Sequence, residues 1–136
     1  SSIEEAALAV PDLTWGDMCD RVVLTAGVVE GDMIEPALGL TAKGGTLVVT
    51  GLAPMLKTDV QMNLFLLAMM NKEVKGTIFG STNPRAQIPN LLSMYREGTL
   101  KLDELVTKRY KLEEINQGYE DMRAGKNIRG VIDFSL

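Results

Sequence analysis

The residue types that most often bind metals or act as catalysts are scarce in this chain. It contains one cysteine, Cys19, and no histidine. Zinc sites need Cys, His or clustered carboxylates at fixed spacing, and the acidic pair Glu113 and Glu114 is typical of a helix first turn instead. A serine or cysteine nucleophile would also lack the histidine that acts as its base. The sequence therefore predicts no metal site and no catalytic residue of its own.

Glycine-rich turns could bind phosphate, and two glycine pairs are the candidates. Gly27 and Gly31 do not follow the G-x-G-x-x-G order of a dinucleotide fingerprint. Gly44 and Gly45 precede a predicted strand, whereas the fingerprint follows a strand and opens a helix. We interpret both pairs as turn and helix-end residues, so the sequence predicts no phosphate loop.

The composition is that of a globular protein, with 46% apolar and 24% charged residues. Eighteen acidic against fourteen basic residues argue against a nucleic-acid partner, because phosphate binding needs a basic face. The longest apolar stretch, 64–70, is far shorter than the roughly 20 residues that span a bilayer, which argues against a membrane partner. The lone Cys19 cannot form an intrachain disulfide, which favours a reducing, cytoplasmic setting.

Strands and helices alternate along the first part of the chain. Three segments are rich in β-branched residues without polar alternation, which is typical of strands covered on both faces: 21–27, 46–51 and 74–79. Parallel strands joined by helical crossovers make up doubly wound sheets. The sequence therefore predicts an α/β fold containing about half of a doubly wound parallel sheet.

Helix signals lie around these strands. Ser2 and Glu5 have the spacing of a capping box, and Pro11 is expected to end or break the helix that they begin. A second helix is expected to end near Gly44. Its apolar face consists of Ile34, Leu38 and Ala42.

Two further helices and two strands are predicted in the second part. Asn83 and Pro84 are a typical helix start, and Gly98 closes that helix. Its apolar stripe is Ile88, Leu91, Leu92 and Tyr95. The next helix has Arg123 in its last turn and Gly125 after it, and its apolar face is Leu112, Ile115, Tyr119 and Met122. The flanking strands are 105–110 and 129–134.

The connection between the second and third strands is rich in methionine and leucine. It covers residues 52–73 and contains three methionines within nine residues. One interpretation is a buried helix. The other is a subunit contact, because flexible Met side chains adapt well to partner surfaces.

Four blocks of sequence carry a resemblance to a known family: Thr50–Pro54, Lys75–Ser81, Leu112–Tyr119 and Gly125–Gly130. Because the blocks occur in that family's order, residues 20–136 resemble the carboxyl-terminal part of the zinc-dependent medium-chain alcohol dehydrogenases. The resemblance is strongest to the actinobacterial class III-like members, some of which are nicotinoproteins that hold their cofactor permanently. The resemblance implies a partial dinucleotide-binding (Rossmann) domain in residues 1–79. It also implies that residues 80–136 are the carboxyl-terminal segment of the catalytic domain and pack on it.

The resemblance also implies where a nicotinamide ring would bind. In the family, main-chain groups at the ends of two strands hold the carboxamide of the ring. The matching residues here are Thr50, Gly51 and Leu52 after one strand, with Thr77 and Phe79 on the other. Backbone groups at strand ends are rigid, which suits them to orienting a ring.

Four other residues are implied as cofactor-binding residues. Thr25, Ala26 and Gly27 end the first strand and would lie near the adenosine ribose. Arg129 matches the arginine that binds the pyrophosphate, a task that suits its permanent charge and bidentate geometry. From the residues alone, Arg129 would be a surface charge at the start of a strand.

The implied function is that of a fragment. The parent would transfer a hydride between an alcohol or aldehyde and NAD(P), with NAD(H) as cofactor, zinc bound outside this chain, and a homodimer formed through Asp59–Leu66. These 136 residues alone are expected to be inactive. Two alternatives remain: a non-catalytic module for dimerisation or weak nucleotide binding, and a zinc-free reductase of the same superfamily.

Overall fold

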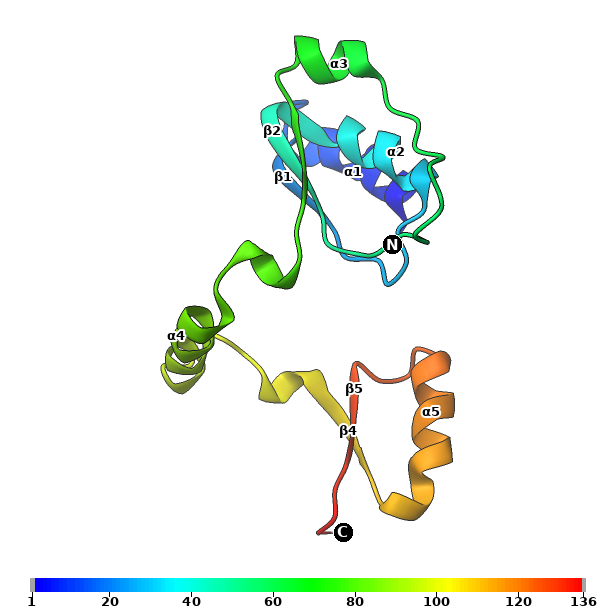
Figure 1. Ribbon diagram of the computed structural model, residues 1–136, viewed down its shortest axis with the longest axis vertical. Coiled ribbons are helices and arrows are strands. Elements are labelled where there is room, and N and C mark those ends of the chain that lie inside the picture. The colour runs from blue at the N-terminus through cyan, green and yellow to red at the C-terminus, as the bar shows by residue number, and fades with distance from the viewer. Residues whose placement is uncertain (1, 136) are drawn as a thin grey trace. The chain divides into compact units, whose positions relative to one another are not determined.

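The computed structural model describes residues 2–135, which form two compact units that divide between Ser81 and Thr82 (Figure 1). The elements of the first unit are α1 (Ile3–Leu13), β1 (Cys19–Leu24), α2 (Ile34–Gly39), β2 (Thr41–Val49), α3 (Leu64–Met69) and β3 (Glu73–Gly76). Those of the second unit are α4 (Pro84–Arg96), β4 (Val106–Tyr110), α5 (Ile115–Arg123) and β5 (Arg129–Ile132). Within residues 2–135, no helix combines the length and apolar character needed to cross a membrane.

The first unit is built on a three-stranded parallel sheet with the order β1-β2-β3. Its buried core is apolar and is formed by Val29, Ile34, Ala37, Leu38 and Leu47. Helix α2 and strand β2 supply most of these side chains. Because all three strands run in one direction, their carboxyl ends meet at the same edge of the sheet.

The start of α1 is predicted correctly, but its end is not. The Ser2 hydroxyl accepts from the Glu5 amide and the Glu5 carboxylate accepts from the Ser2 amide, which completes the capping box. The helix continues through Pro11 to Leu13, so the expectation that Pro11 ends or breaks it is wrong. A single missing N–H is tolerated here, and the Thr14 amide and hydroxyl both donate to the Val10 carbonyl to close the last turn.

The boundary between α2 and β2 also differs from the prediction. Helix α2 ends at Gly39, and Ala42 lies in β2, so Ala42 does not share a helical face with Ile34 and Leu38. The strand begins at Thr41 because Thr41 pairs with Cys19, and pairing resumes at Thr46 opposite Arg21. The extra residues of β2 form an irregularity in the ladder, which sequence periodicity does not reveal.

Strands β1 and β3 end earlier than predicted, at Leu24 and Gly76. After β3, a short 3₁₀ turn at Phe79–Ser81 contains three successive residues with positive φ. A left-handed backbone cannot continue a strand, so pairing stops before this turn.

The second unit contains a two-stranded parallel sheet, β4-β5, with α5 between the strands in sequence. Both predicted strands are present, and β5 is shorter than expected by two residues at its end. The predicted start of α4 is confirmed: the Asn83 side chain accepts from the Arg85 amide, and Pro84 is the first helical residue. The predicted glycine stops are also confirmed, since Gly98 and Gly125 both have positive φ.

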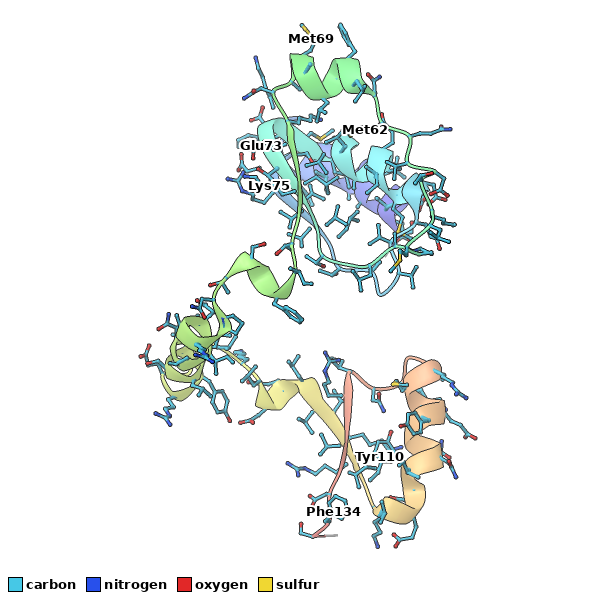
Figure 2. The ribbon with its side chains drawn as sticks, viewed as in Figure 1. Met62, Met69, Glu73, Lys75, Tyr110 and Phe134 are labelled. Carbon is cyan, nitrogen blue, oxygen red and sulfur yellow. The ribbon has the colours of Figure 1, made fainter. Side chains whose placement is uncertain are left out.

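The Met-rich connection is largely exposed. No residue of α3 is buried, so the buried-helix interpretation is wrong. Leu64 and Phe65 are 67% and 69% exposed, while Met62 and Leu67 are half-buried against the core of the first unit. Figure 2 shows Met69 on α3, where its side chain is also exposed. The alternative interpretation, a subunit contact, stays a prediction.

Candidate functional site

The carboxyl edge of the first sheet carries the same residue type after each strand. Thr25 follows β1, Thr50 follows β2 and Thr77 follows β3. The Thr50 amide and hydroxyl both donate to the Leu24 carbonyl, over 3.1 Å and 2.7 Å. The Thr77 amide donates to the Val49 carbonyl over 3.1 Å. These bonds extend the ladder one residue beyond the strands and hold the turns that follow in fixed positions.

The turns after β1 and β2 approach each other closely. A Cβ atom at Gly51 would lie 2.2 Å from the Ala26 carbonyl oxygen, so only glycine fits there without a shift of the backbone. Val28 and Leu52 form an isolated parallel bridge, and the Val29 amide donates to the Leu52 carbonyl over 3.1 Å. The structure therefore brings Ala26 close to Gly51, and it joins the residues that follow each of them through the bridge of Val28 to Leu52.

The side of these turns that faces away from the core is open. Thr25, Gly27, Thr50 and Leu52 are exposed. A Cβ atom at Gly27 would meet no other atom within 4 Å. Doubly wound folds bind ligands beyond the carboxyl ends of their parallel strands, and this open edge lies in that position.

The turn after β3 is conformationally unusual. Phe79, Gly80 and Ser81 have φ values of 48°, 72° and 52°. The Thr77 and Ser81 hydroxyls lie 2.8 Å apart and are hydrogen-bonded across the turn. The Phe79 side chain is 84% exposed, so any contribution of Phe79 to cofactor binding would come from its backbone or from a surface contact. Left-handed non-glycine residues store strain, which is common at ligand sites.

Arg129 belongs to the second unit, where it begins β5 opposite Val106. Its side chain is exposed, and Nη1 donates to the Ile128 carbonyl over 2.8 Å. Arg129 also lines a pocket of about 340 Å³ together with Tyr110 and Asn127. Its assignment to the cofactor pyrophosphate stays a prediction.

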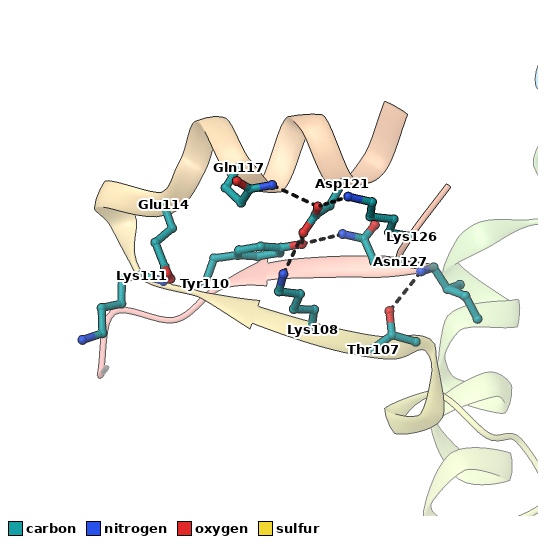
Figure 3. Close-up of polar contacts among 10 residues, drawn as sticks. Thr107, Lys108, Tyr110, Lys111, Glu114, Gln117, Asp121, Lys126 and Asn127 are labelled. Atoms are coloured by element: carbon teal, nitrogen blue, oxygen red, sulfur yellow. Dashed lines mark hydrogen bonds and ion pairs between the residues drawn. The ribbon is translucent and has the colours of Figure 1, made fainter. Parts of the chain in front are cut away.

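A polar network around the buried side chains of Tyr110 and Asp121 in the second unit was not predicted from the sequence (Figure 3). The carboxylate of Asp121, which is 3% exposed, accepts from the Tyr110 hydroxyl over 2.8 Å and from Lys108 Nζ over 2.7 Å. It also accepts from Gln117 Nε2 over 3.0 Å. Asn127 Nδ2 donates to the Tyr110 hydroxyl over 2.8 Å. The only sequence signal for the network is the i, i+4 pair of Gln117 and Asp121 on one helical face.

The network favours the ionised forms of Asp121 and Lys108. The hydrogen bond from Lys108, followed by the one from Tyr110, holds the pKa of Asp121 far below its ordinary value of 3.8. The same contact with Asp121 raises the pKa of Lys108. The Lys108 ammonium also lies 4.8 Å from the centre of the Tyr110 ring. Asp121 is therefore an ionised, fully bonded carboxylate at neutral pH.

A second pocket, of about 460 Å³, lies in the first unit beside the turn that precedes α2. Three of its charged residues form ion pairs: Lys57 contacts Glu30 and lies 3.7 Å from Asp59. The hydrogen bond with Glu30 raises the pKa of Lys57. None of the nine predicted cofactor residues lines this pocket, and its ion pairs act to hold the loop after β2.

A zinc ion does not fit the donor groups of this chain. Among residues 2–135, no three Cys, His, Asp or Glu side chains gather closely enough to hold a metal ion. Cys19, the one thiol, is half-buried in β1. No step of zinc chemistry is therefore assigned to residues of this chain.

Comparison with known proteins identifies relatives of the whole chain. A family model described as zinc-binding dehydrogenase matches residues 2–97. The NDMA-dependent alcohol dehydrogenase of Amycolatopsis methanolica is 51% identical over 97% of this chain and 36% of its own length. Alcohol dehydrogenase B of Mycobacterium tuberculosis is 47% identical over 98% of this chain and 36% of its own length. The chain thus spans about a third of the length of these relatives.

Solved structures show the same fold. Benzyl alcohol dehydrogenase from Acinetobacter calcoaceticus has a TM-score of 0.81 and 26% identity, over 95% of this chain and 35% of its own. An alcohol dehydrogenase zinc-binding domain protein from Burkholderia ambifaria has a TM-score of 0.80 and 25% identity, over 94% and 34%. These matches confirm the predicted Rossmann-like α/β fold with parallel sheets. The chain therefore belongs to the zinc-binding dehydrogenase family and is related to the carboxyl-terminal part of its alcohol dehydrogenases.

Proposed function

We propose that this chain is the carboxyl-terminal part of an alcohol dehydrogenase that uses NAD(H) or NADP(H). Residues 1–79 would supply half of the dinucleotide-binding domain, and residues 80–136 would pack on the catalytic domain. The enzyme would contain zinc, bound by residues outside this chain, and a cytoplasmic setting fits the single unpaired Cys19. Strand β1 lies at one edge of its sheet, and further strands of the dinucleotide domain would continue the sheet there.

One observation carries this proposal: the close approach of Gly51 to Ala26, with the bridge of Val28 to Leu52, at an exposed carboxyl edge in a chain whose relatives are alcohol dehydrogenases. When bound, the dinucleotide would accept or donate the hydride. The residues at the edge would bind it and orient its nicotinamide ring. Small residues after β1 would leave room for the adenosine ribose, and Thr50–Leu52, Thr77 and Phe79 would border the ring.

The backbone at this edge is suited to orientation because it is held from several directions. Thr50 and Thr77 donate to carbonyls of the neighbouring strands, and Leu52 accepts from Val29. A ring fixed against such a backbone would present one face to the substrate, which lowers the entropic cost of reaching the transition state. The alternative of a non-catalytic module is not favoured by the 51% identity to an alcohol dehydrogenase.

The test uses the complete polypeptide encoded by the reading frame that contains these residues. We expect alcohol-dependent reduction of NAD⁺ or NADP⁺, lost when zinc is chelated. A parallel assay with added NDMA would detect turnover on a permanently bound cofactor. No activity with any simple alcohol in either assay would contradict the proposal.

Substitution of Gly27 tests the location of the cofactor. Gly27→Leu would place a side chain in the open space beyond β1, and we expect the affinity for NADH to fall at least about tenfold through steric exclusion. Gly39→Leu is the matched control, because Gly39 is exposed at the end of α2 and a Cβ atom there would also meet no other atom within 4 Å. Equal NADH affinity in the two variants would exclude the proposed adenosine site.

A further inference from the structure

Two segments border the carboxyl edge of the first sheet: the β1 turn (residues 25–31), which follows β1, and the β2 loop (residues 50–61), which follows β2. Their inner contacts lie at the candidate site, where Gly51 approaches Ala26 and the Leu52 carbonyl accepts a bond from the β1 turn. The two segments meet again further from the strands, at residues that the proposed function does not yet use. All of these residues belong to the first unit.

The first outer contact is an ion pair between Lys57 of the β2 loop and Glu30 of the β1 turn. Lys57 Nζ also lies 3.7 Å from the Asp59 carboxylate. The Lys57 and Glu30 side chains are 47% and 39% exposed, and exposed ion pairs contribute little to the stability of a whole protein. The effect of this pair is therefore local: it holds the β2 loop against the β1 turn.

The second outer contact is between Asp59 and Gly31, which is buried. A Cβ atom at Gly31 would lie 2.9 Å from Asp59 Oδ1 and 3.0 Å from the Asp59 carbonyl oxygen, so a side chain there would displace the β2 loop. Gly51 has the reciprocal role at the inner contact, where a Cβ atom would lie 2.2 Å from the Ala26 carbonyl oxygen. Each segment therefore supplies one glycine that lets the other segment approach.

A short piece of chain connects the outer contacts with the inner ones. The Lys57 amide donates to the Pro54 carbonyl over 3.0 Å, which closes a turn, and the backbone of Pro54 is itself restricted. One residue separates Pro54 from Leu52. Glu30 directly follows Val29, whose amide donates to the Leu52 carbonyl over 3.1 Å. The outer contacts are thus linked to Leu52 from both sides, and a displacement of Lys57 would reach the Leu52 backbone.

The β2 loop has few other restraints. Residues 52–60 are all exposed, so packing in the core does not hold them. In the part of the chain that the structure describes, residues 58–61 form no backbone hydrogen bond. The contacts with Glu30 and Gly31 are therefore the ones that fix the course of the loop before it reaches Met62, which packs against the core.

We propose that Glu30, Gly31 and Lys57 are positioning residues, which hold the Leu52 backbone where it can orient the nicotinamide ring of the dinucleotide. This inference rests on the proposed function, which places the ring beside Thr50–Leu52. The three residues do not touch the cofactor themselves, and they act through the two links to Leu52. A backbone that is already held loses less conformational freedom when the ligand binds, so the affinity rises.

Charge reversal in the complete polypeptide tests the ion pair. Glu30→Lys and Lys57→Glu each place two like charges together, and we expect the affinity for NADH to fall about fivefold. The affinity for ADP-ribose, which lacks the nicotinamide ring, should change less than about twofold. Both ligands carry the pyrophosphate, so a change in the electric field of the protein would affect them equally. The double variant restores an ion pair and should bind NADH within about twofold of the wild type.

A second variant tests the contact with Asp59 without a change of charge. Gly31→Ala would press a methyl group on the Asp59 backbone, and we expect the affinity for NADH alone to fall about threefold. Its control is Gly39→Ala, because a Cβ atom at Gly39 would meet no other atom within 4 Å. Lys43→Glu is the control for charge, because Lys43 is exposed near the amino-terminal end of β2, away from the carboxyl edge.

Both controls should leave the affinities for NADH and ADP-ribose unchanged, and circular dichroism establishes that each variant is folded. Equal losses for the two ligands in Glu30→Lys and Lys57→Glu, or a double variant as weak as the single ones, would overturn the inference. Wild-type affinity for NADH in these variants and in Gly31→Ala would also overturn it, while a loss in Gly27→Leu left the cofactor site intact. Equal NADH affinity in Gly27→Leu and Gly39→Leu would overturn both the inference and the location of the cofactor, but not alcohol oxidation itself.

Discussion

Gly51 is the residue at which the candidate site depends most directly on backbone shape. The carbonyl of Ala26 and the side chain of Val29 occupy the space that a side chain at this position would need. Gly27 lies in the facing turn but has open space around it. The two glycines therefore have different roles: one allows two turns to approach, and the other leaves room beyond them.

Replacing these glycines by alanine should separate the two roles. We expect Gly51→Ala to lower the free energy of unfolding by roughly 1–3 kcal/mol, because the new methyl group forces the two turns apart. Gly27→Ala should be neutral or stabilising by up to about 1 kcal/mol, because it only restricts the unfolded chain. Urea denaturation measures both changes. If Gly51→Ala and Gly27→Ala had the same free energy of unfolding, the close approach of the two turns would not require glycine at position 51.

Asp121 should make the stability of the second unit depend on acid pH. Its pKa in the folded protein lies below the ordinary value of 3.8, so its stabilising contribution is complete above that value and is lost as the pH falls toward the folded-state pKa. We expect the wild-type protein to lose more stability than Asp121→Asn between about pH 5 and about pH 2. Asp133 and Glu73 also have lowered pKa values and contribute equally to both proteins. Parallel pH profiles from chemical denaturation would contradict this assignment.

Helix α4 shows how a local signal can define an element. Its start depends on the Asn83 side chain, which accepts from the Arg85 amide over 3.0 Å. None of its residues is buried, so packing within this chain stabilises it little. Capping should therefore contribute a large share of its helicity.

We expect Asn83→Ala to destabilise α4 by about 1 kcal/mol and to reduce the helical signal in circular dichroism. Asn90→Ala is the matched control, because Asn90 is exposed in the middle of the same helix, where alanine is the better helix former. Its helicity should stay equal or rise. A loss of helicity in Asn90→Ala comparable to that in Asn83→Ala would show that the cap contributes nothing specific.

The elements that the sequence predicts correctly are those with local signals. The cap of α4 and the glycine ends of α4 and α5 need only neighbouring residues. The start of β2 was missed because it depends on pairing between Thr41 and Cys19, which are distant in sequence. The end of α1 was missed because hydrogen bonds of Thr14 close the helix beyond Pro11.

The candidate functional residues also divide into those that the sequence pattern predicts and those that depend on contacts between distant residues. The contact of Ala26 with Gly51 follows from two strand ends that meet at one edge, which a parallel sheet predicts. The Asp121 network joins residues on two different elements, and its members are polar and separated by unequal intervals. Periodicity identifies apolar faces, so a buried polar cluster of this kind escapes it.

At the scale of the whole molecule, several large apolar side chains of the first unit are exposed. On α1 and just after it, Leu8, Leu13 and Trp15 are all largely exposed, and α3 adds a second apolar surface. Apolar side chains that gather into one exposed patch mark interaction sites. The chain spans 36% of the length of its relatives, so we expect other parts of an alcohol dehydrogenase to cover some of this surface.

We propose that two copies of the enzyme pair through Asp59–Leu66, a segment that includes the first turn of α3. Leu64 is the better residue for a test than Met62, because Met62 packs against the core of the first unit and a charge there would also unfold the protein. Leu64→Glu should weaken the dimer by about 2 kcal/mol or more, since it buries a charge at the interface.

Met55→Glu, at a residue 95% exposed in the loop after β2, is the matched control. Sedimentation velocity of the complete polypeptide should show monomers for Leu64→Glu and dimers for Met55→Glu. A dimer that persists unchanged in Leu64→Glu would place the subunit contact on another surface.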